Sequence, residues 1–246
     1  MDTSDDIERL IRLLDSDGHD ANGLGPDDAQ GELTALGRAA DVVTPLVRAL
    51  PGLGPFAQLC AVEIFQELRD SRAVAALITL LDSADERVRE WSAYALADLR
   101  AVEAVPTLKR AWSASKARGD DPGEGEPRSL RSALTVLGAR SSVRPGVPAA
   151  SGIGAVEAWP SARLVEVLDE LAVRDQVILG FTVWRIGEKG GLYYDDATPR
   201  AADLDFTAPW PAIVRQAHAA ARTDALVIQP RGDLVAAIDW ISSTDV

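Results

Sequence analysis

A 31-residue repeat constrains the fold of this chain more than any other feature of its sequence. Apolar triplets with i, i+3, i+7 spacing recur in one register: Val43, Leu46, Leu50; Val74, Leu77, Leu81; Val105, Leu108, Trp112. That spacing places each triplet on one face of an amphipathic helix. A second series shows the same shift, from Ala61, Ile64, Phe65, Leu68 to Ser92, Ala95, Leu96, Leu99. Two helices per unit predict a helical solenoid, in which each pair buries its apolar face against its neighbours.

The register changes at both ends of this region. Ile7, Leu10 and Leu14 predict the first helix of a leading repeat, with a loop over 15–28 and a second helix over about 29–40. Residues 113–126 contain three glycines and a proline, which predicts a flexible insertion. A last apolar stripe follows at Leu130, Ala133, Leu134 and Leu137. We therefore expect about four repeats within residues 1–140.

The stretch from Ala73 to Trp112 resembles the bacterial HEAT-like repeats first described in phycobilisome lyases. The positions that carry the resemblance are Asp82, Asp85, Val88, Arg89, Ala93, Ala95, Leu96, Leu99, Ala104, Val105, Pro106 and Leu108. It extends over about residues 5–140. The resemblance implies an α-solenoid. Repeats of this kind occur in scaffolds, chaperone-like proteins, toxin-neutralising proteins and a few enzymes, so it implies binding of macromolecules more than one chemistry.

The second half of the chain has a different periodicity. Residues 141–160 are rich in Gly and Pro and predict a linker. Residues 161–246 predict a small α+β domain with a mainly antiparallel sheet and the order α-β-β-α-β-β. The expected helices span 161–174 and 209–222, and the expected strands 177–186, 192–195, 225–229 and 234–241. The last segment also fits a helical stripe, which leaves a helix as the alternative there.

Composition bounds the function classes. The chain has 246 residues and a net charge of −13, which opposes binding to phosphate backbones. No apolar run approaches the length of a membrane span. A single cysteine and an acidic beginning without an apolar leader favour a cytoplasmic protein. The locally basic segment 109–144, which includes Arg131, is most simply ordinary surface arginine. Its alternatives are a docking surface for an acidic protein or for the chain's own acidic first 41 residues, and a DNA-binding surface.

No catalytic, metal or cofactor site is predicted. The two histidines, His19 and His218, do not form the His-Glu pairs of an iron hydroxylase, and a zinc site needs three or four ligands. Cys60 lies among apolar residues and predicts a small buried side chain. Nucleophile-elbow and P-loop motifs are absent. We therefore expect a protein that is not an enzyme.

Candidate partner-binding residues lie on the predicted second helices. Glu63 and Glu67 are one turn apart, Tyr94 and Asp98 occupy the same places one repeat later, and Glu90 precedes Tyr94 by one turn. Second helices usually line the concave face of such a stack, so these residues predict a binding ridge. The alternative is a solvated helix face. Outside this ridge, Arg131 and the pair Tyr193 and Tyr194, beside Asp195 and Asp196, are further candidates.

The leading hypothesis is protein–protein interaction, with an unidentified protein partner. One version is neutralisation of a toxin or regulation of an enzyme through the concave repeat face and the C-terminal domain. The first alternative is a lyase-like protein that holds a small molecule in a pocket between the domains. The second alternative is nucleic-acid binding, for which this sequence supplies no continuous basic stripe.

Overall fold

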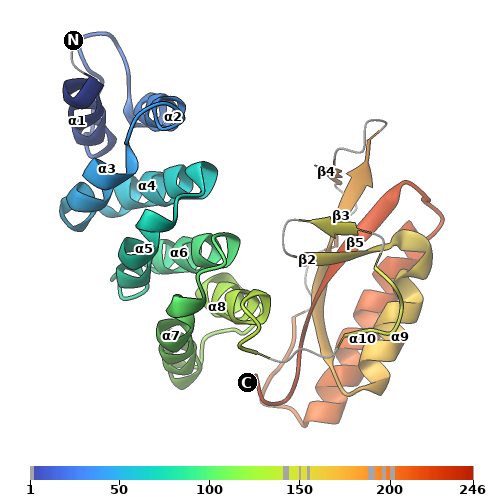
Figure 1. The fold of residues 1–246 in the computed structure, drawn as a ribbon. Coiled ribbons are helices and arrows are strands. Elements are labelled where there is room, and N and C mark those ends of the chain that lie inside the picture. The colour runs from blue at the N-terminus through green and yellow to red at the C-terminus, as the bar shows by residue number, and fades with distance from the viewer. Residues whose placement is uncertain are drawn as a thin grey trace. The chain divides into compact units, whose positions relative to one another are not determined.

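The chain forms two compact units in a computed structural model, the repeat unit (Met1–Arg140) and the sheet unit (Ser141–Val246) (Figure 1). The structure describes residues 3–140, 144–149, 151–153, 156–187, 192–195, 198–199 and 203–245. In these residues, no helix combines the length and the hydropathy that a membrane crossing requires.

The repeat unit consists of four helix pairs, as the sequence predicts. The first helices are α1 (Thr3–Leu14), α3 (Val43–Ala49), α5 (Val74–Leu80) and α7 (Val105–Arg118). The second helices are α2 (Pro26–Leu36), α4 (Pro55–Leu68), α6 (Glu86–Asp98) and α8 (Gly125–Val136). Short 3-10 turns lie at Leu50–Gly52, Ser71–Ala73 and Val102–Ala104. The first helices form one layer and the second helices the other (Figure 1).

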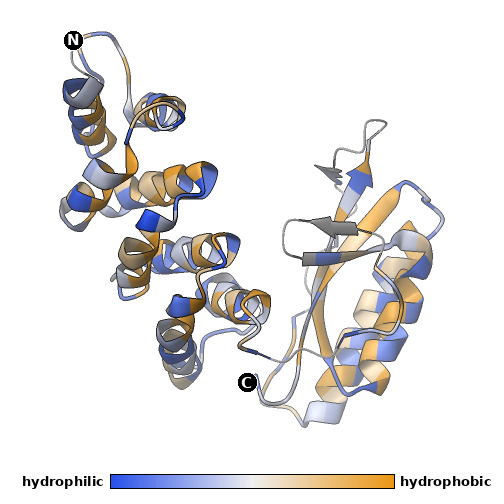
Figure 2. Cartoon of the chain, in the orientation of Figure 1, coloured by the Kyte–Doolittle hydropathy of each residue, from blue (hydrophilic) through white to orange (hydrophobic). Residues whose placement is uncertain are grey.

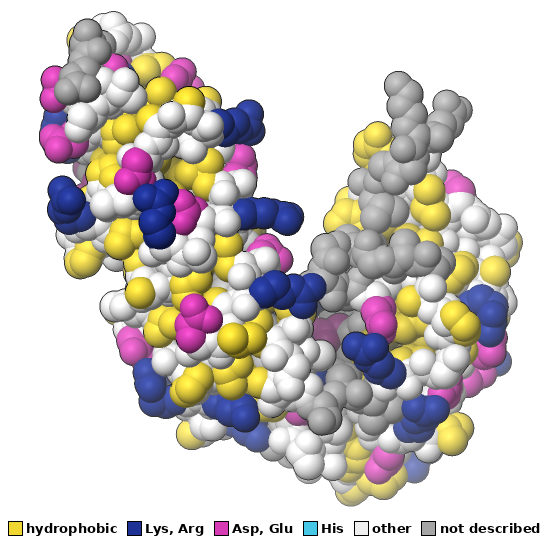
Figure 3. All heavy atoms as spheres, viewed as in Figure 1, with side chains coloured by type: hydrophobic (Ala, Val, Ile, Leu, Met, Phe, Trp, Pro, Cys, Tyr) yellow, Lys and Arg dark blue, Asp and Glu magenta, His cyan; other side chains and the backbone are white. Residues whose placement is uncertain are grey.

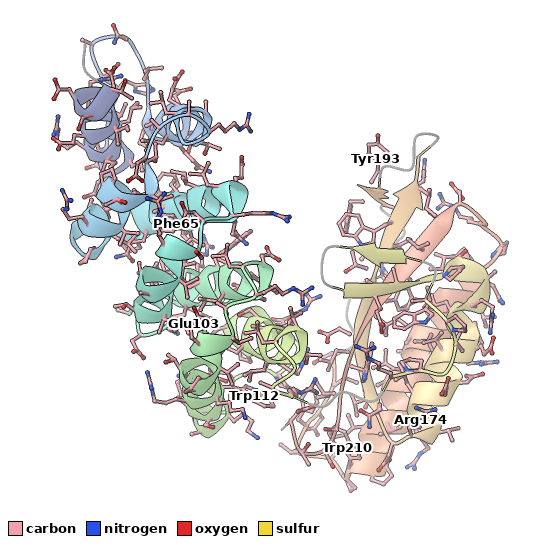
Figure 4. All side chains as sticks on the ribbon, in the orientation of Figure 1. Phe65, Glu103, Trp112, Arg174, Tyr193 and Trp210 are labelled. Atoms are coloured by element: carbon pink, nitrogen blue, oxygen red, sulfur yellow. The ribbon has the colours of Figure 1, made fainter. Side chains whose placement is uncertain are left out.

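The repeated apolar positions form the core between these layers. Leu46, Leu77 and Leu108, which occupy equivalent places in three repeats, are fully buried. Phe65 of α4 is also fully buried and lies inside the unit (Figure 4). Asp85 caps α6 by accepting a hydrogen bond from the Val88 amide at 3.1 Å. The capping residue and the apolar periodicity thus predict the same helix.

Two segments of the repeat unit have helix boundaries other than the predicted ones. The segment predicted as an insertion over 113–126 begins as helix, because α7 continues to Arg118. Its residues are mostly good helix formers, and the Lys116 ammonium lies 5.2 Å from the Trp112 ring centroid one turn earlier. Gly119 then ends the helix at φ +75°. The second helix of the leading repeat spans Pro26–Leu36 instead of about 29–40, so it begins within the segment predicted as a loop.

The sheet unit is an α+β structure with an antiparallel sheet. Its strands are β1 (Ser151–Ile153), β2 (Val156–Pro160), β3 (Val177–Ile186), β4 (Leu192–Tyr194) and β5 (Leu234–Ile241), in the order β1-β2-β5-β3-β4. A 3-10 turn (Ser161–Arg163), α9 (Leu164–Val173) and α10 (Trp210–Ile228) complete it. The two helices lie side by side along the sheet (Figure 1). Figure 2 shows hydrophobic residues along β3 and β5, where Phe181, Val183 and Ile238 pack against α9 and α10.

The segment 141–160, predicted to be a linker, supplies two strands. Trp159 of β2 pairs with Ala236 of β5, and its ring packs edge-on against Trp240 at a centroid distance of 6.0 Å. The Trp159 Nε1 donates to the Val147 carbonyl at 2.9 Å. Long-range pairing and one buried tryptophan therefore order a segment whose local composition favours a loop.

The predicted strand 225–229 is wrong, because α10 continues to Ile228. Ala221, Ala225 and Ile228 follow the helical spacing and are buried in the core that α9 and β5 share. The β-branched residues of this stretch resemble a strand only when they are read without the preceding helix. The predicted strand over 234–241 is confirmed, and its pairing with β3 excludes the helical alternative.

Candidate functional site

A strip of exposed and half-buried acidic and aromatic side chains runs over the second helices α4 and α6. We call it the second-helix face and define it as Phe56, Glu63, Glu67, Glu90, Trp91, Tyr94 and Asp98. On α4 these residues are seven and four positions apart, and on α6 Glu90, Tyr94 and Asp98 are four apart with Trp91 three before Tyr94, which places them on one side of each helix. Trp91 is 41% exposed and Phe56 55% exposed. Five of the seven are the residues of the predicted binding ridge.

Amide–carboxylate hydrogen bonds connect this face across neighbouring repeats. Gln30 of α2 donates through Nε2 to Glu63 Oε2 at 2.5 Å. Gln66 of α4 donates through Nε2 to Asp98 Oδ2 at 3.1 Å. Each bond joins one second helix to the next, so the acidic side chains are held in register along the stack.

Aromatic side chains lie beside the acidic ones on α6. Trp91 and Tyr94 pack edge-on, with ring centroids 6.3 Å apart and an interplanar angle of 69°. Such a pair offers a rigid apolar area with polar tips, the kind of surface that is enriched at protein interfaces.

The Glu90 carboxyl beside this pair has a raised pKa. Burial is the largest cause, and repulsion from the Glu86 carboxylate adds to it. Arg128 of α8 partly opposes the shift. A cationic partner group placed near Glu90 would therefore relieve an unfavourable charge as well as form a new contact.

A shallow groove of about 520 Å³ extends the face toward α2. It is lined by Asp27, Gln30, Gly31, Thr34, Ala35, Arg38 and Glu67. Gly31 and Ala35 line it with small residues, and a Cβ added at Gly31 would have no atom within 4 Å. Glu67 belongs to both the groove and the second-helix face, so the two form one continuous surface.

Not all predicted site residues lie on this surface. Arg131 is only 3% exposed, and its Nη1 donates to the Pro122 carbonyl at 2.6 Å. The expectation that Arg131 lies at the surface is therefore wrong, since its guanidinium supports the loop before α8, and its contact with a partner stays a prediction. Sequence reasoning placed it at the surface because Arg is seldom buried.

Tyr193 and Tyr194 belong to the sheet unit, on strand β4 (Figure 4). They are 64% and 59% exposed, and Tyr194 packs edge-on against Trp184. The neighbouring Asp195 is buried and forms an ion pair with Arg185, at 2.6 Å. Asp196 lies outside the described residues. Because successive side chains of a strand point to opposite faces, Tyr194 lies on the face of Trp184 and Tyr193 on the face of Arg185, and Asp195 supports the sheet.

Sequence reasoning missed Phe56, Trp91 and the groove. Trp91 lies one residue after Glu90 and three before Tyr94, so its place on the stripe was available from spacing alone. The groove could not be predicted from spacing, because it depends on how the small residues of α2 are placed beside α4 in the folded chain.

Two of the side chains considered for chemistry, Cys60 and His218, are buried or hydrogen-bonded in the structure. Burial raises the pKa of the Cys60 thiol to about 11, which makes the group a poor nucleophile. His218 Nε2 lies 2.7 Å from Asp169 Oδ1, and Arg222 also contacts that carboxylate. Within the described ranges, His, Cys, Asp and Glu do not gather in any group of three suited to a metal ion.

A family model described as HEAT repeats matches residues 57–119. No curated protein and no solved structure matches the chain. The matched range runs from α4 into α7 and contains most of the second-helix face. HEAT repeats generally serve as protein-interaction and scaffold elements. The central helices of the repeat unit are thus HEAT-like repeats.

Proposed function

We propose that the repeat unit is a protein-interaction module that holds a protein partner against the second-helix face. The Trp91–Tyr94 pair, with an exposed Trp91 and a half-buried Tyr94, carries this proposal together with the carboxylates of Glu67, Glu90 and Asp98 on the same face. Aromatic side chains at the centre of a surface, with polar groups around them, are the usual arrangement of an interface hot spot.

The charge of this surface favours a partner with basic side chains. The four ionisable acids of the face are Glu63, Glu67, Glu90 and Asp98, and the whole chain has a net charge of −13. Charge complementarity raises the association rate and excludes acidic competitors. An arginine of the partner can also stack on Trp91 while it pairs with a neighbouring carboxylate.

A finer version concerns the biological role. We propose a bacterial cytoplasmic protein of the phycobilisome-lyase repeat type that neutralises a toxin or regulates an enzyme by covering part of its surface. The resemblance of residues 73–112 to that repeat type supports this version. A rigid repeat surface suits a stoichiometric blocking role, although fold alone does not determine function.

The test compares two charge-reversal variants that change the net charge equally. Glu67→Lys with Asp98→Lys alters the second-helix face, where both side chains are exposed. Asp17→Lys with Glu103→Lys is the control, at exposed positions outside the face. Tagged proteins are used to capture partners from host lysate, which are quantified by mass spectrometry, and thermal unfolding is followed by circular dichroism.

We expect wild type and control to capture the same stoichiometric protein, and the face variant to lose most of it without a large change in melting temperature. Equal capture by both variants would contradict a role for this face. A face variant that does not fold would assign these side chains to stability. In that case the single change Trp91→Ala repeats the comparison, because Trp91 is exposed.

A further inference from the structure

We infer that three arginines at the ends of the second helices bind an acidic, extended segment of a partner protein. We call Arg38, Arg69 and Arg100 the arginine row. They are separated by 31 residues each, so they occupy the same place in three successive repeats. All three are exposed. Figure 3 shows Lys and Arg side chains spaced along the edge of the repeat unit on the side of the second helices.

These guanidinium groups are not used in ion pairs within the described residues. Other arginines of the repeat unit are, such as Arg9 with Asp20, Arg72 with Asp70 and Arg89 with Glu126. Arg100 donates through Nη1 to the Val136 carbonyl at 3.1 Å, which leaves its other nitrogens for a ligand. With 38 acidic against 25 basic side chains, the chain offers many internal partners, yet the row forms none in the part that the structure describes.

The backbone at two of these positions also favours a different residue. Arg69 and Arg100 have φ values of 50° and 55°, in the left-handed region that glycine adopts most easily. Two other helices of the same unit end with glycine in that region, Gly119 at φ 75° and Gly138 at φ 69°. An arginine gains from the dipole at a helix C-terminus, but this gain only offsets the conformational cost. Arginine at these two positions therefore adds little to folding stability. A role in binding would explain why arginine is present there.

The spacing of the row indicates the shape of the ligand. Packed neighbouring helices lie about 8–10 Å apart. Each arginine of the row follows the next second helix, so we expect neighbouring arginines to be separated by about this distance. A polyproline II segment has three residues per turn and rises about 3.1 Å per residue, so every third side chain lies on one side, about 9 Å apart. Carboxylates at every third position of such a segment match the row. Arginine binds a carboxylate through two parallel hydrogen bonds, which strengthens each contact.

The net charge of −13 does not prevent this contact. At physiological ionic strength, charges farther away than about 8 Å are largely screened, so the groups close to the row decide the contact: the three arginines attract the segment, and Glu67 and Asp98 beside them oppose it. A nucleic acid is the less favourable ligand, because three phosphate contacts release few counterions and the rest of the chain repels the backbone.

The probe for the test is a fluorescent synthetic peptide of repeated Glu-Pro-Pro triplets, titrated with the full chain at physiological ionic strength. The variant Arg69→Gly with Arg100→Gly removes two charges and places the favoured residue at both left-handed positions. The matched control, Arg12→Gln with Arg110→Gln, removes two exposed arginines from first helices. Fluorescence anisotropy gives the affinity, and circular dichroism gives the melting temperature.

We expect saturable binding by wild type and control, and affinity at least about tenfold lower in the glycine variant, which would melt near the wild-type temperature. A peptide of equal composition with its glutamates contiguous should bind more weakly. Absence of wild-type binding, equal affinity of the two variants, or indifference to glutamate spacing would overturn the inference. The inference would also be overturned if an oligonucleotide bound the wild type more tightly than the peptide does and the glycine variant lost that binding.

This inference does not depend on the second-helix face. The variant Glu67→Lys with Asp98→Lys should bind the Glu-Pro-Pro peptide at least as well as wild type, because it adds positive charge beside the row. Failure of peptide binding would therefore contradict the role of the arginine row and not the proposed function. Loss of partner capture by the face variant would not contradict the role of the arginine row.

Discussion

Arg89 of α6 donates through Nη2 to the Glu126 carboxylate of α8, with the two atoms 2.6 Å apart. Glu126 is only 2% exposed, and Arg118 of α7 also donates to the same oxygen, at 3.0 Å. One buried carboxylate therefore holds three helices of the last two repeats together. Hydrogen bonding to this carboxylate also raises the pKa of Arg89.

Removing Arg89 should destabilise the repeat unit markedly. Breaking a buried ion pair from one side typically costs about 3–5 kcal/mol, and we expect Arg89→Ala to lie near the lower end because Arg118 remains. The matched change Arg110→Ala removes an exposed partner of Asp82 and should cost less than about 1 kcal/mol. Urea unfolding measures both. Equal, small losses would show that Glu126 is solvated in solution.

Two glycines of the leading repeat should respond in opposite directions to alanine. Gly31 lies inside α2, and an added Cβ would have no atom within 4 Å. Gly31→Ala should therefore stabilise the helix by about 0.5–1 kcal/mol. At Gly37 an added Cβ would lie 2.5 Å from Leu68 Cδ1, so Gly37→Ala should cost about 1–3 kcal/mol through overpacking. Chemical denaturation of the two variants checks this, and changes of the same sign would mean that α2 and α4 pack differently.

Gly31 also lines the groove beside Glu67. If Gly31→Ala raises stability and lowers partner capture, then glycine is present at this position for binding and not for folding.

Two phenylalanines of α4 provide a test of the layer arrangement. Phe65 is fully buried, whereas Phe56 is 55% exposed on the second-helix face. Phe65→Ala should cost about 3–5 kcal/mol. Phe56→Ala should change the free energy of unfolding by less than about 0.5 kcal/mol. Urea unfolding gives both values. A large loss at Phe56 would indicate that this side chain is covered by another part of the molecule or by a second copy.

The repeat unit could be predicted from sequence because one signal recurs. Val43, Val74 and Val105 begin equivalent helices, and a period repeated three times outweighs local ambiguity. The failures lie where tertiary contacts override composition. Trp159 orders a Gly- and Pro-rich segment by packing on Trp240, and Ala225 continues a helix because its side chain is buried against α9.

The candidate site was predictable only in part, for a related reason. The 31-residue spacing places Glu67 and Asp98 at equivalent positions of successive repeats, and it does the same for Arg69 and Arg100, which were not predicted as site residues. The left-handed backbone at those arginines and the burial of Arg131 by the Pro122 loop are properties of the folded chain. Periodicity thus identifies which residues share a face, whereas exposure depends on what packs over them.

The raised pKa of Glu90 gives a prediction with a definite pH dependence. Burial, and then the Glu86 carboxylate, raise the folded-state pKa above the ordinary value of 4.5, despite Arg128. A carboxyl whose pKa is raised on folding binds its proton more tightly in the folded state. Its ionisation therefore weakens folding as the pH rises through the folded-state pKa, and it has no such effect below the unfolded-state pKa.

Glu90→Gln should accordingly melt at a higher temperature than wild type near neutral pH and at about the same temperature near pH 3, where both side chains are uncharged. Melting temperatures across this pH range measure the difference. In a Glu86→Gln background the gain should shrink but persist, because burial is the larger cause. A variant that melts lower at neutral pH would mean that the Glu90 carboxylate is stabilised by its surroundings. A gain in stability together with weaker partner capture would show that the charge is retained for binding, at a cost to folding.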